Sequence, residues 1–301
     1  MDIEQLNSDF GIEGQLKFVK GNGGFPFIQI RNRSATALIC VYAAQVLSFR
    51  PTEEHEDLLF LSSKSVYDDG KAIRGGIPVC WPWFGDHAVG LDRPSHGFVR
   101  NGLWTVAGTE ATTDFETKIR LKFPENAHND HCWQQAFALE LEICVGDTLT
   151  LDLMTRNTGE QSFSITQAFH TYLQIGNIGR VRILGLEDAV YADKLDENRQ
   201  KRQTGALTVW EEVDRIYTDV QNELIVVDAA FKRRIKIAAA YSKSAVVWNP
   251  WTKKSAILPD LNDTDFRRFI CVETGNVAGN VVEVPPDSAC RLLTNFEIIR
   301  D

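Results

Sequence analysis

The chain has 301 residues, of which 44% are hydrophobic and 24% charged, and its 41 acidic residues outnumber its 32 basic ones to give a net charge of −9. This apolar content with a modest net charge excludes a disordered chain. The acidic balance argues against binding along a nucleic-acid backbone, although a local basic pocket for one small anion remains possible. No apolar run approaches the roughly 20 residues that span a bilayer, and the start lacks the features of a secretory signal, so we expect no membrane association and a cytoplasmic protein.

Strand-like runs follow one another from the N-terminal region onward. Residues 25–30 and 38–49 are the first, and in 117–123 apolar residues alternate with charged ones. The runs 137–143 and 149–153 alternate in the same way, and Gly146-Asp147 between them predicts a tight hairpin. One apolar and one polar face per strand is typical of antiparallel sheets that bury one side.

The second half of the chain continues the pattern. Further strands are expected at 180–184, 223–227, 234–239, 245–248, 269–272, 281–284 and 292–299. Long amphipathic helical patterns are scarce, no linker divides the chain and no fixed-period repeat is visible. The sequence therefore predicts a single all-β domain over residues 1–301, built as a large antiparallel β-sandwich.

The six cysteines form no CxxC pair, and five stand beside apolar residues. Buried free thiols explain them, since a free cysteine behaves as a small hydrophobe. Their spacing matches no zinc motif, so we predict no metal site.

Residues 74–85 are the most unusual stretch, with three glycines, two prolines and three large aromatic residues. Prolines exclude a central strand. The stretch is either a buried structural loop or a wall on which a sugar stacks. Arg74 opens it, either as an ordinary surface arginine or as a planar fork for a phosphate or carboxylate.

Histidine, arginine and acidic residues mark five further positions. His96 and Arg100 would face the same side of an extended segment, although an exposed loop explains them as well. His170 lies in an apolar run and is either a structural histidine or a general acid. Glu273 follows four apolar residues, where a carboxylate is costly unless paired, so it is a candidate general base. Asp214 precedes Arg215 in what could be a solvated charged turn.

Two weaker clusters are given structural explanations. His128 and His131 have a metal-like spacing but lie in a polar stretch, where a solvated turn accounts for them. Residues 232–234 are consecutive basic residues that we interpret as solubilising charge at a strand edge. No phosphate-binding loop, dinucleotide motif or serine-nucleophile motif is present.

Taken together, these stretches resemble the aldose 1-epimerase superfamily, and within it the D-hexose-6-phosphate mutarotases, or glucose-6-phosphate 1-epimerases. The first 25 or so residues add nothing to the resemblance and are expected to be peripheral. The matching stretches are Arg74-Gly75-Gly76-Ile77-Pro78, Trp81-Pro82, Phe84-Gly85, Ser95-His96-Gly97-Phe98-Val99-Arg100-Asn101, His170-Thr171-Tyr172, Val213-Asp214-Arg215-Ile216-Tyr217, Trp248-Asn249-Pro250 and Cys271-Val272-Glu273-Thr274.

The resemblance implies a galactose-mutarotase-like β-sandwich, or supersandwich, with the site in a cleft on one sheet. It implies that His170 is the general acid and Glu273 the general base. Substrate-binding roles fall to Arg74, Arg100 and Asp214 and to His96 near the ring oxygen, with Ser95 standing where some members carry a longer glutamine. It further implies a hexose phosphate as the partner, no cofactor or metal, and a monomer or weak homodimer.

The expected chemistry is the exchange of sugar anomers through ring opening and closure. A base takes the proton of the C1 hydroxyl while an acid protonates the ring oxygen. We expect an ionised Glu273 beside a protonated His170, favoured by their mutual attraction, and a bell-shaped pH dependence near neutrality. Alternatives are an epimerase for unphosphorylated aldoses, a sugar-binding sandwich without catalysis, a phosphosugar sensor, and a polysaccharide hydrolase or lyase.

Overall fold

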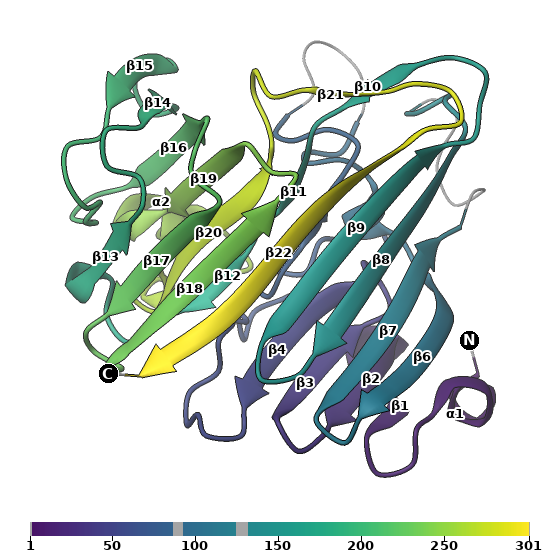
Figure 1. Ribbon diagram of the computed structural model, residues 1–301. Coiled ribbons are helices and arrows are strands. Elements are labelled where there is room, and N and C mark those ends of the chain that lie inside the picture. Colours follow the sequence, from purple (N-terminus) through teal and green to yellow (C-terminus); the bar gives the residue numbers. More distant parts are fainter. Residues whose placement is uncertain (1, 87–92, 125–131, 301) are drawn as a thin grey trace.

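The structure, a computed structural model, describes residues 2–86, 93–124 and 132–300. Figure 1 shows these residues as layers of antiparallel strands with few helices. The described strands form two eight-stranded sheets, one four-stranded sheet and a two-stranded ribbon. The predicted fold class, a large antiparallel β-sandwich, is therefore confirmed.

The first eight-stranded sheet, here the β22 sheet, forms the long front layer of Figure 1. Its β8 and β9 pair from Val145↔Leu149 outward, which confirms the predicted hairpin. Along β8, residues alternate between buried and partly exposed, because one face packs on the core. In order, its strands are β13 (Val181–Leu184), β17 (Glu223–Asp228), β18 (Arg233–Ala240), β22 (Ala289–Arg300), β9 (Leu149–Asn157), β8 (Phe137–Val145), β7 (Glu116–Phe123) and β6 (Thr105–Thr113).

The second eight-stranded sheet, here the β20 sheet, lies behind the first (Figure 1). All eight residues of β20 are buried, as expected for a strand covered on both faces. In order, its strands are β15 (Arg199–Arg202), β14 (Val190–Asp193), β16 (Val213–Thr218), β19 (Ser244–Asn249), β20 (Phe269–Asn276), β11 (Gln167–Phe169) and β5 (Val79–Cys80), and β12 (Tyr172–Gln174) also pairs with β20.

The two faces of β20 have different neighbours. Thr274 shares a hydrogen bond with Thr294 of β22, so the even-numbered residues face the β22 sheet. Side chains alternate along a strand, so Cys271 and Glu273 point to the opposite face. The carboxylate predicted as a base therefore lies outside the layer between the two large sheets.

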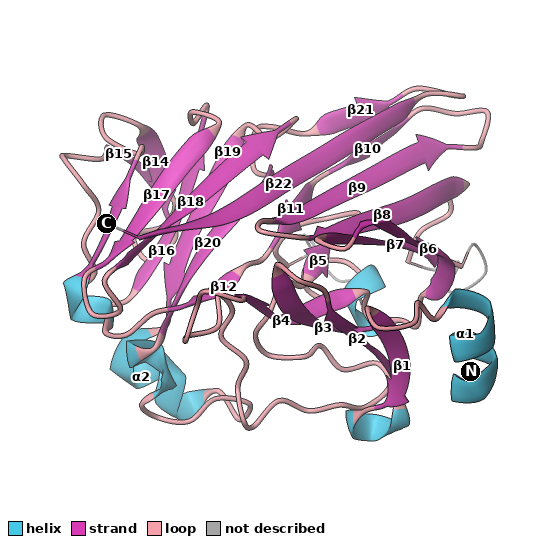
Figure 2. Ribbon diagram, turned by 60° about the horizontal axis from the view of Figure 1, so that its bottom comes forward, coloured by secondary structure: helices cyan, strands magenta, loops and turns pink. Residues whose placement is uncertain are grey.

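A four-stranded sheet covers the other end of the β22 sheet, beneath β7 and β8 in Figure 2. Several of its buried residues, among them Ile28 and Ile39, belong to the same core cluster as Leu141 of β8. The run 38–49 was expected as one strand but is two, because Ala43 and Ala44 have φ angles of 65° and 48° and reverse the chain. The strands in order are β1 (Leu16–Lys20), β2 (Pro26–Arg31), β3 (Ala35–Cys40) and β4 (Gln45–Pro51).

Short helices complete the fold. Helix α1 (Ile3–Phe10) begins at Asp2, whose carboxylate accepts the Glu4 amide hydrogen. Neither α1 nor α2 was predicted. The remaining elements are α2 (Trp251–Ile257), the ribbon strands β10 (Phe163–Ile165) and β21 (Val282–Val284), and the 3-10 turns η1 (Asn22–Gly24), η2 (Val99–Asn101), η3 (Ile178–Arg180) and η4 (Asp265–Arg267).

Several smaller predictions can be compared with this fold. All six cysteines are free, with Cys40, Cys80 and Cys271 buried and the other three partly buried. His128 and His131 lie outside the described residues. Within the described ranges, no helix is long and apolar enough to cross a membrane.

The interpretation of residues 232–234 as a solvated charge cluster is wrong for its central member. Arg233 is 2% exposed. Its guanidinium group donates to the carbonyl oxygens of Glu56, Asp57 and Gln174, so it joins β18 to the segment that follows β4 and to β12. A buried guanidinium is accommodated because backbone carbonyls satisfy its donors.

Candidate active site

One cavity of about 480 Å³ brings together all seven residues that the sequence singled out for chemistry. They come from loops and strands far apart in the chain. The roles assigned to them stay predictions, whereas their convergence is a property of the fold. The seven are Arg74, Ser95, His96, Arg100, His170, Asp214 and Glu273.

The pairing of β11 and β12 with β20 places His170 beside Glu273. Phe169 pairs with Thr274 and Tyr172 with Cys271, so counting inward from either pair sets His170 opposite Glu273. Directly opposed residues on one face of an antiparallel pair lie within contact distance. Two residues 103 positions apart in the sequence are thus cross-strand neighbours.

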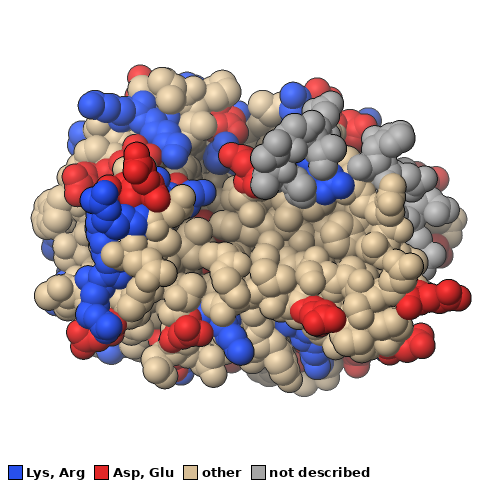
Figure 3. Space-filling model, turned by 90° about the horizontal axis from the view of Figure 1, so that it is seen from above, with Lys and Arg blue, Asp and Glu red and all other residues tan. Residues whose placement is uncertain are grey.

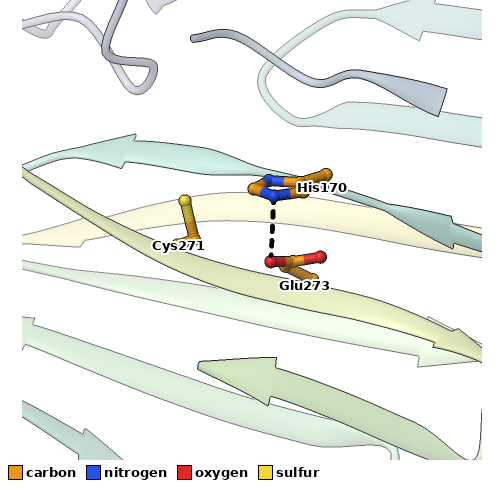
Figure 4. A group of neighbouring side chains, drawn as sticks. All are labelled: His170, Cys271 and Glu273. Atoms are coloured by element: carbon orange, nitrogen blue, oxygen red, sulfur yellow. Dashed lines mark ion pairs between the residues drawn. The ribbon is translucent and has the colours of Figure 1, made fainter. Parts of the chain in front are cut away.

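The side chains of this pair form the floor of the cavity. The Nε2 atom of His170 lies 3.4 Å from Oε1 of Glu273 (Figure 4). Glu273 is 2% and His170 8% exposed. The second carboxyl oxygen, Oε2, and the second imidazole nitrogen, Nδ1, are buried without a hydrogen-bond partner. Both atoms therefore keep an unused hydrogen-bonding capacity.

Burial moves both groups of the pair toward their neutral forms. It raises the pKa of the Glu273 carboxyl well above its usual range, and the Asp214 carboxylate adds to the rise. It lowers the pKa of His170 to about 3, and the positive charges of Arg100 and Arg74 act in the same direction. Desolvation thus opposes the ion pair expected from the sequence, and that ion pair stays a prediction.

Neighbouring rings fix the imidazole of His170. The Tyr172 ring stacks on it with centroids 4.8 Å apart and planes 14° apart. The His96 ring meets it edge-on at 5.5 Å. Tyr172 belongs to the His-Thr-Tyr stretch that carries the resemblance, but no signal in the sequence pointed to a role for it.

Arg74 is held in a fixed orientation at the cavity wall. Its Nε donates to Oδ2 of Asp260 at 3.0 Å and its Nη1 to the Tyr172 hydroxyl at 2.8 Å. Gly76 follows with a φ of 61°, and a Cβ there would collide with the Val46 carbonyl. Nη2 also lies 3.0 Å from the same Oδ2, which leaves two of the five N–H groups of the guanidinium for a ligand.

His96 and Arg100 both line the cavity, but not from an extended segment as expected. His96 has a φ of 60° and Gly97 one of 78°, and Arg100 lies in the 3-10 turn η2. A Cβ at position 97 would collide with the Trp81 carbonyl, so only glycine allows the chain to approach Trp81, the residue after β5, this closely. The two side chains are thus brought together by a turn rather than by a shared strand face.

The hydrogen bonds of His96 and Arg100 determine which of their donor groups remain free for a ligand. The Gly85 amide donates to Nδ1 of His96 at 3.3 Å, so the neutral ring carries its proton on Nε2. Burial, together with the Arg100 charge, lowers the pKa of His96 and keeps the ring neutral. Arg100 donates through Nη2 to the Ser95 carbonyl at 2.7 Å, and its Nε is buried without a partner.

Asp214 lines the cavity from β16, which is separated from β20 only by β19 in the same sheet. It lies on β16 opposite Trp248 of β19, and burial raises its pKa while Lys194 and Lys254 oppose the rise. The two lysines also line the cavity. Lys254 is paired with Glu212 at 3.2 Å, whereas Lys194 is exposed at the cavity mouth. No motif in the sequence marked either lysine.

The described residues contain one cluster that could hold a metal ion, formed by His170, Cys271 and Glu273 with ligand atoms within 4.8 Å of one another (Figure 4). Burial raises the pKa of the Cys271 thiol well above its usual range. A thiol must lose its proton to bind a metal, so these residues are poorly prepared for one.

A larger hollow of about 890 Å³ lies over the outer face of the four-stranded sheet. In the described part of the chain, no histidine or cysteine lines it. On the described part of the face drawn in Figure 3, basic and acidic side chains lie beside one another. The chemistry is therefore concentrated in the cavity of the β20 sheet.

A histidine and a buried glutamate thus lie in contact in one cavity of an antiparallel β-sandwich. A sequence profile of the aldose 1-epimerase family matches residues 26–296. The chain therefore belongs to the aldose 1-epimerase family, and it is an epimerase.

Individual relatives agree with this assignment. A protein of Cenchrus ciliaris with the provisional name glucose-6-phosphate 1-epimerase is 33% identical over 283 residues, which cover 91% of this chain and 83% of the relative. An Escherichia coli (strain K12) protein with the same provisional name is 34% identical over 275 residues, covering 91% and 90%. The crystal structure of a Salmonella typhimurium protein, provisionally described as a mutarotase, superposes with a TM-score of 0.90 at 26% identity over 99% of both chains.

Proposed function

We propose that the protein interconverts the α and β anomers of a hexose 6-phosphate, with glucose 6-phosphate as the foremost substrate. The observation that carries the proposal is the 3.4 Å pair of His170 and Glu273 in a cavity whose wall also holds Arg74 and Arg100. The names of the relatives support the choice of substrate.

In the proposed reaction, one proton is taken up and one is given in each direction. The Glu273 carboxylate accepts the proton of the C1 hydroxyl while the C1–O5 electron pair moves to O5, which receives the Nε2 proton of His170. The ring opens to the aldehyde, and rotation about C1–C2 presents its other face. On closure O5 returns its proton to His170, and Glu273 returns its proton to the new C1 hydroxyl.

The surrounding residues have binding roles in this proposal. The Nε2–H of His96 donates to a ring or hydroxyl oxygen of the sugar, and Asp214 accepts from sugar hydroxyl groups. Arg74 and Arg100 bind the phosphate, whose oxygens suit guanidinium donors. Ser95 lines the cavity and positions Arg100 through its backbone carbonyl. No cofactor or metal takes part.

One observation favours a second candidate, an epimerase for unphosphorylated aldoses. The Asp260 carboxylate offsets the charge of Arg74, with Oδ2 3.0 Å from Nη2. A neutral sugar needs no free positive charge in its site. Arg100 argues for the phosphate, because in the described structure no carboxylate lies within ion-pair distance of it.

The partner and the compartment follow from the same proposal. A hexose 6-phosphate is a small anion, so the protein needs only the local positive charge of the cavity despite its net charge of −9. We place it in the cytoplasm as a monomer or weak homodimer that binds neither nucleic acid nor membrane.

The proposal is tested by two-dimensional NMR exchange spectroscopy on glucose 6-phosphate, glucose and galactose, with and without enzyme. Acceleration restricted to the phosphorylated sugar is expected. His170→Ala and an enzyme-free sample are the controls, because the spontaneous reaction is measurable. Acceleration of free sugars alone would support the second candidate. Line broadening of the phosphosugar without exchange would reveal a binding or sensing protein instead.

Arg100→Ala is expected to raise KM for glucose 6-phosphate by about 10- to 100-fold, the loss of a hydrogen bond to a charged group, while activity on free glucose changes little. Steady-state anomer exchange on both sugars measures the ratio. Arg202→Ala, on β15 outside the cavity, is the matched control. Equal losses on both sugars would remove Arg100 from the phosphate site.

A further inference from the structure

Tyr172 lies between His170 and Arg74, two residues to which the proposed function gives different tasks. It is 2% exposed and begins β12, two residues after His170. Its amide donates to the Gly76 carbonyl at 2.9 Å, and the amide of His170 donates to the Pro78 carbonyl at 2.9 Å. The segment that begins with Arg74 therefore runs alongside the segment that carries His170, and the Tyr172 side chain contacts both residues.

The imidazole of His170 lacks the hydrogen bond that commonly orients a catalytic histidine through its second ring nitrogen. In the described part of the chain, its Nδ1 has no hydrogen-bond partner. The Tyr172 ring stacks on the imidazole instead, with planes 14° apart. Trp248 packs edge-on against the tyrosine ring at 6.1 Å and Phe269 at 5.4 Å, so that ring is itself held. Turning the imidazole about its Cβ–Cγ bond, away from Glu273, would break the stack.

The hydroxyl group of Tyr172 supports Arg74. It accepts from Nη1 at 2.8 Å, while Oδ2 of Asp260 accepts from Nε at 3.0 Å and lies 3.0 Å from Nη2. Partners on two sides leave the guanidinium little freedom, and a donor that is already oriented loses less entropy when it binds a ligand. One side chain thus orients Arg74 through its oxygen and His170 through its ring.

We infer that Tyr172 is a positioning residue with two separable actions. Its ring keeps the imidazole of His170 directed at Glu273, and its hydroxyl group keeps Arg74 oriented for the substrate. The inference rests on the proposed function, which supplies the roles of His170 and Arg74. It assigns the ring to the rate of proton transfer, measured as kcat, and the hydroxyl group to substrate binding, measured as KM.

Tyr172→Phe tests the hydroxyl group, because it keeps the ring. KM for glucose 6-phosphate is expected to rise about 3- to 10-fold, the loss of one hydrogen bond, with kcat nearly unchanged. In an Arg74→Ala background the same change should leave KM where Arg74→Ala alone puts it, since both changes act through one guanidinium. Anomer exchange measured over a range of substrate concentrations gives both constants. An unchanged KM, or an equal rise with and without Arg74, would overturn this part of the inference.

Tyr172→Leu and Tyr172→Met test the ring. Both remove the flat surface under the imidazole, and the flexible methionine refills most of the space in the core. For either variant kcat is expected to fall about 10- to 100-fold, the effect of a misplaced catalytic group, whereas Tyr172→Phe restores it. A folded leucine or methionine variant with the kcat of the wild type would show that the ring does not position His170.

Tyr217→Leu is the matched control for the loss of a buried tyrosine. Tyr217 is 0% exposed, and its hydroxyl group donates to Oε1 of Gln203 at 2.8 Å. It lies on β16 three residues after Asp214, so its side chain points to the opposite face from that cavity residue. Its kcat should stay near that of the wild type at temperatures where melting curves show each variant folded. A fall in kcat as large as that of Tyr172→Leu would mean that loss of core packing explains both.

The failure of this inference differs from the failure of the proposed function. If the wild type accelerates glucose 6-phosphate and the variants of Tyr172 do not separate KM from kcat, the inference fails and the proposed function stands. If the wild type accelerates no sugar, the proposed function fails on the wild type alone and the inference falls with it.

Discussion

Glu273→Gln is expected to reduce the enzyme-dependent anomer exchange by about 10²- to 10⁴-fold, the range that a positioned acid or base contributes. The amide keeps the shape of the side chain but cannot accept the proton of the C1 hydroxyl. Exchange spectroscopy at matched enzyme and substrate concentrations measures the loss. Glu283→Gln, on the exposed side of β21, is the matched control. A variant with near wild-type exchange would show that Glu273 is not the base.

The same variant is expected to be at least as stable as the wild type, by an amount that grows with pH. The pKa of Glu273 is raised in the folded state, so between the unfolded and folded values the folded protein holds a proton that the unfolded chain releases. Stability from this group is therefore lost as pH rises through that window. Melting curves from pH 4 upward should show the advantage of the glutamine variant widening. A difference that is constant with pH would contradict the raised pKa.

Arg233→Ala is expected to lower the free energy of unfolding by about 3 kcal/mol or more, because it leaves three carbonyl oxygens without their donor and creates a cavity. The bonds at stake run from Nη2 to the carbonyls of Gln174 and Asp57 at 2.7 and 2.9 Å, and from Nη1 to that of Glu56 at 3.3 Å. For a chain of this size the melting temperature should fall by roughly 6 °C or more. Differential scanning calorimetry measures both quantities.

The control for Arg233→Ala is Arg182→Ala, an exposed arginine on β13. Removal of a surface arginine is expected to change the unfolding free energy by no more than about 0.5 kcal/mol. If the two variants have the same melting temperature, the free energy that Arg233 gains from its carbonyl partners is no larger than the cost of removing its guanidinium from water.

Strand periodicity predicted most of the fold, because alternation reports directly which face of a strand is buried. The hairpin at Gly146-Asp147 and the strands β17 to β20 fall where the pattern placed them. The turn inside 38–49 was missed, since Ala43 and Ala44 carry no sequence signal for a positive φ. Arg233 was misjudged because three consecutive basic residues do not show which of them faces inward.

The prediction of the site depended mainly on the family resemblance, whereas the prediction of the fold depended mainly on strand periodicity. Periodicity could not bring His170 beside Glu273, because that pairing follows from strand register across 103 residues. Nor could composition identify the support of Arg74, since Asp260 lies in an ordinary polar stretch and contacts it only in the folded chain. Nor could the sequence show how completely His170 and Glu273 are buried, which bears on the ion pair expected between them.

The site residues come from two kinds of structure: paired strands of a sheet, and a loop. Glu273 lies on β20 and His170 joins the two short strands paired with it, while Ser95, His96 and Arg100 come from a connecting segment. A protein built this way can evolve new substrate preferences by exchanging a loop while its proton-transfer machinery stays fixed in the sheet. Residues 94–101 are thus the natural segment to vary in a library that seeks activity on other sugars.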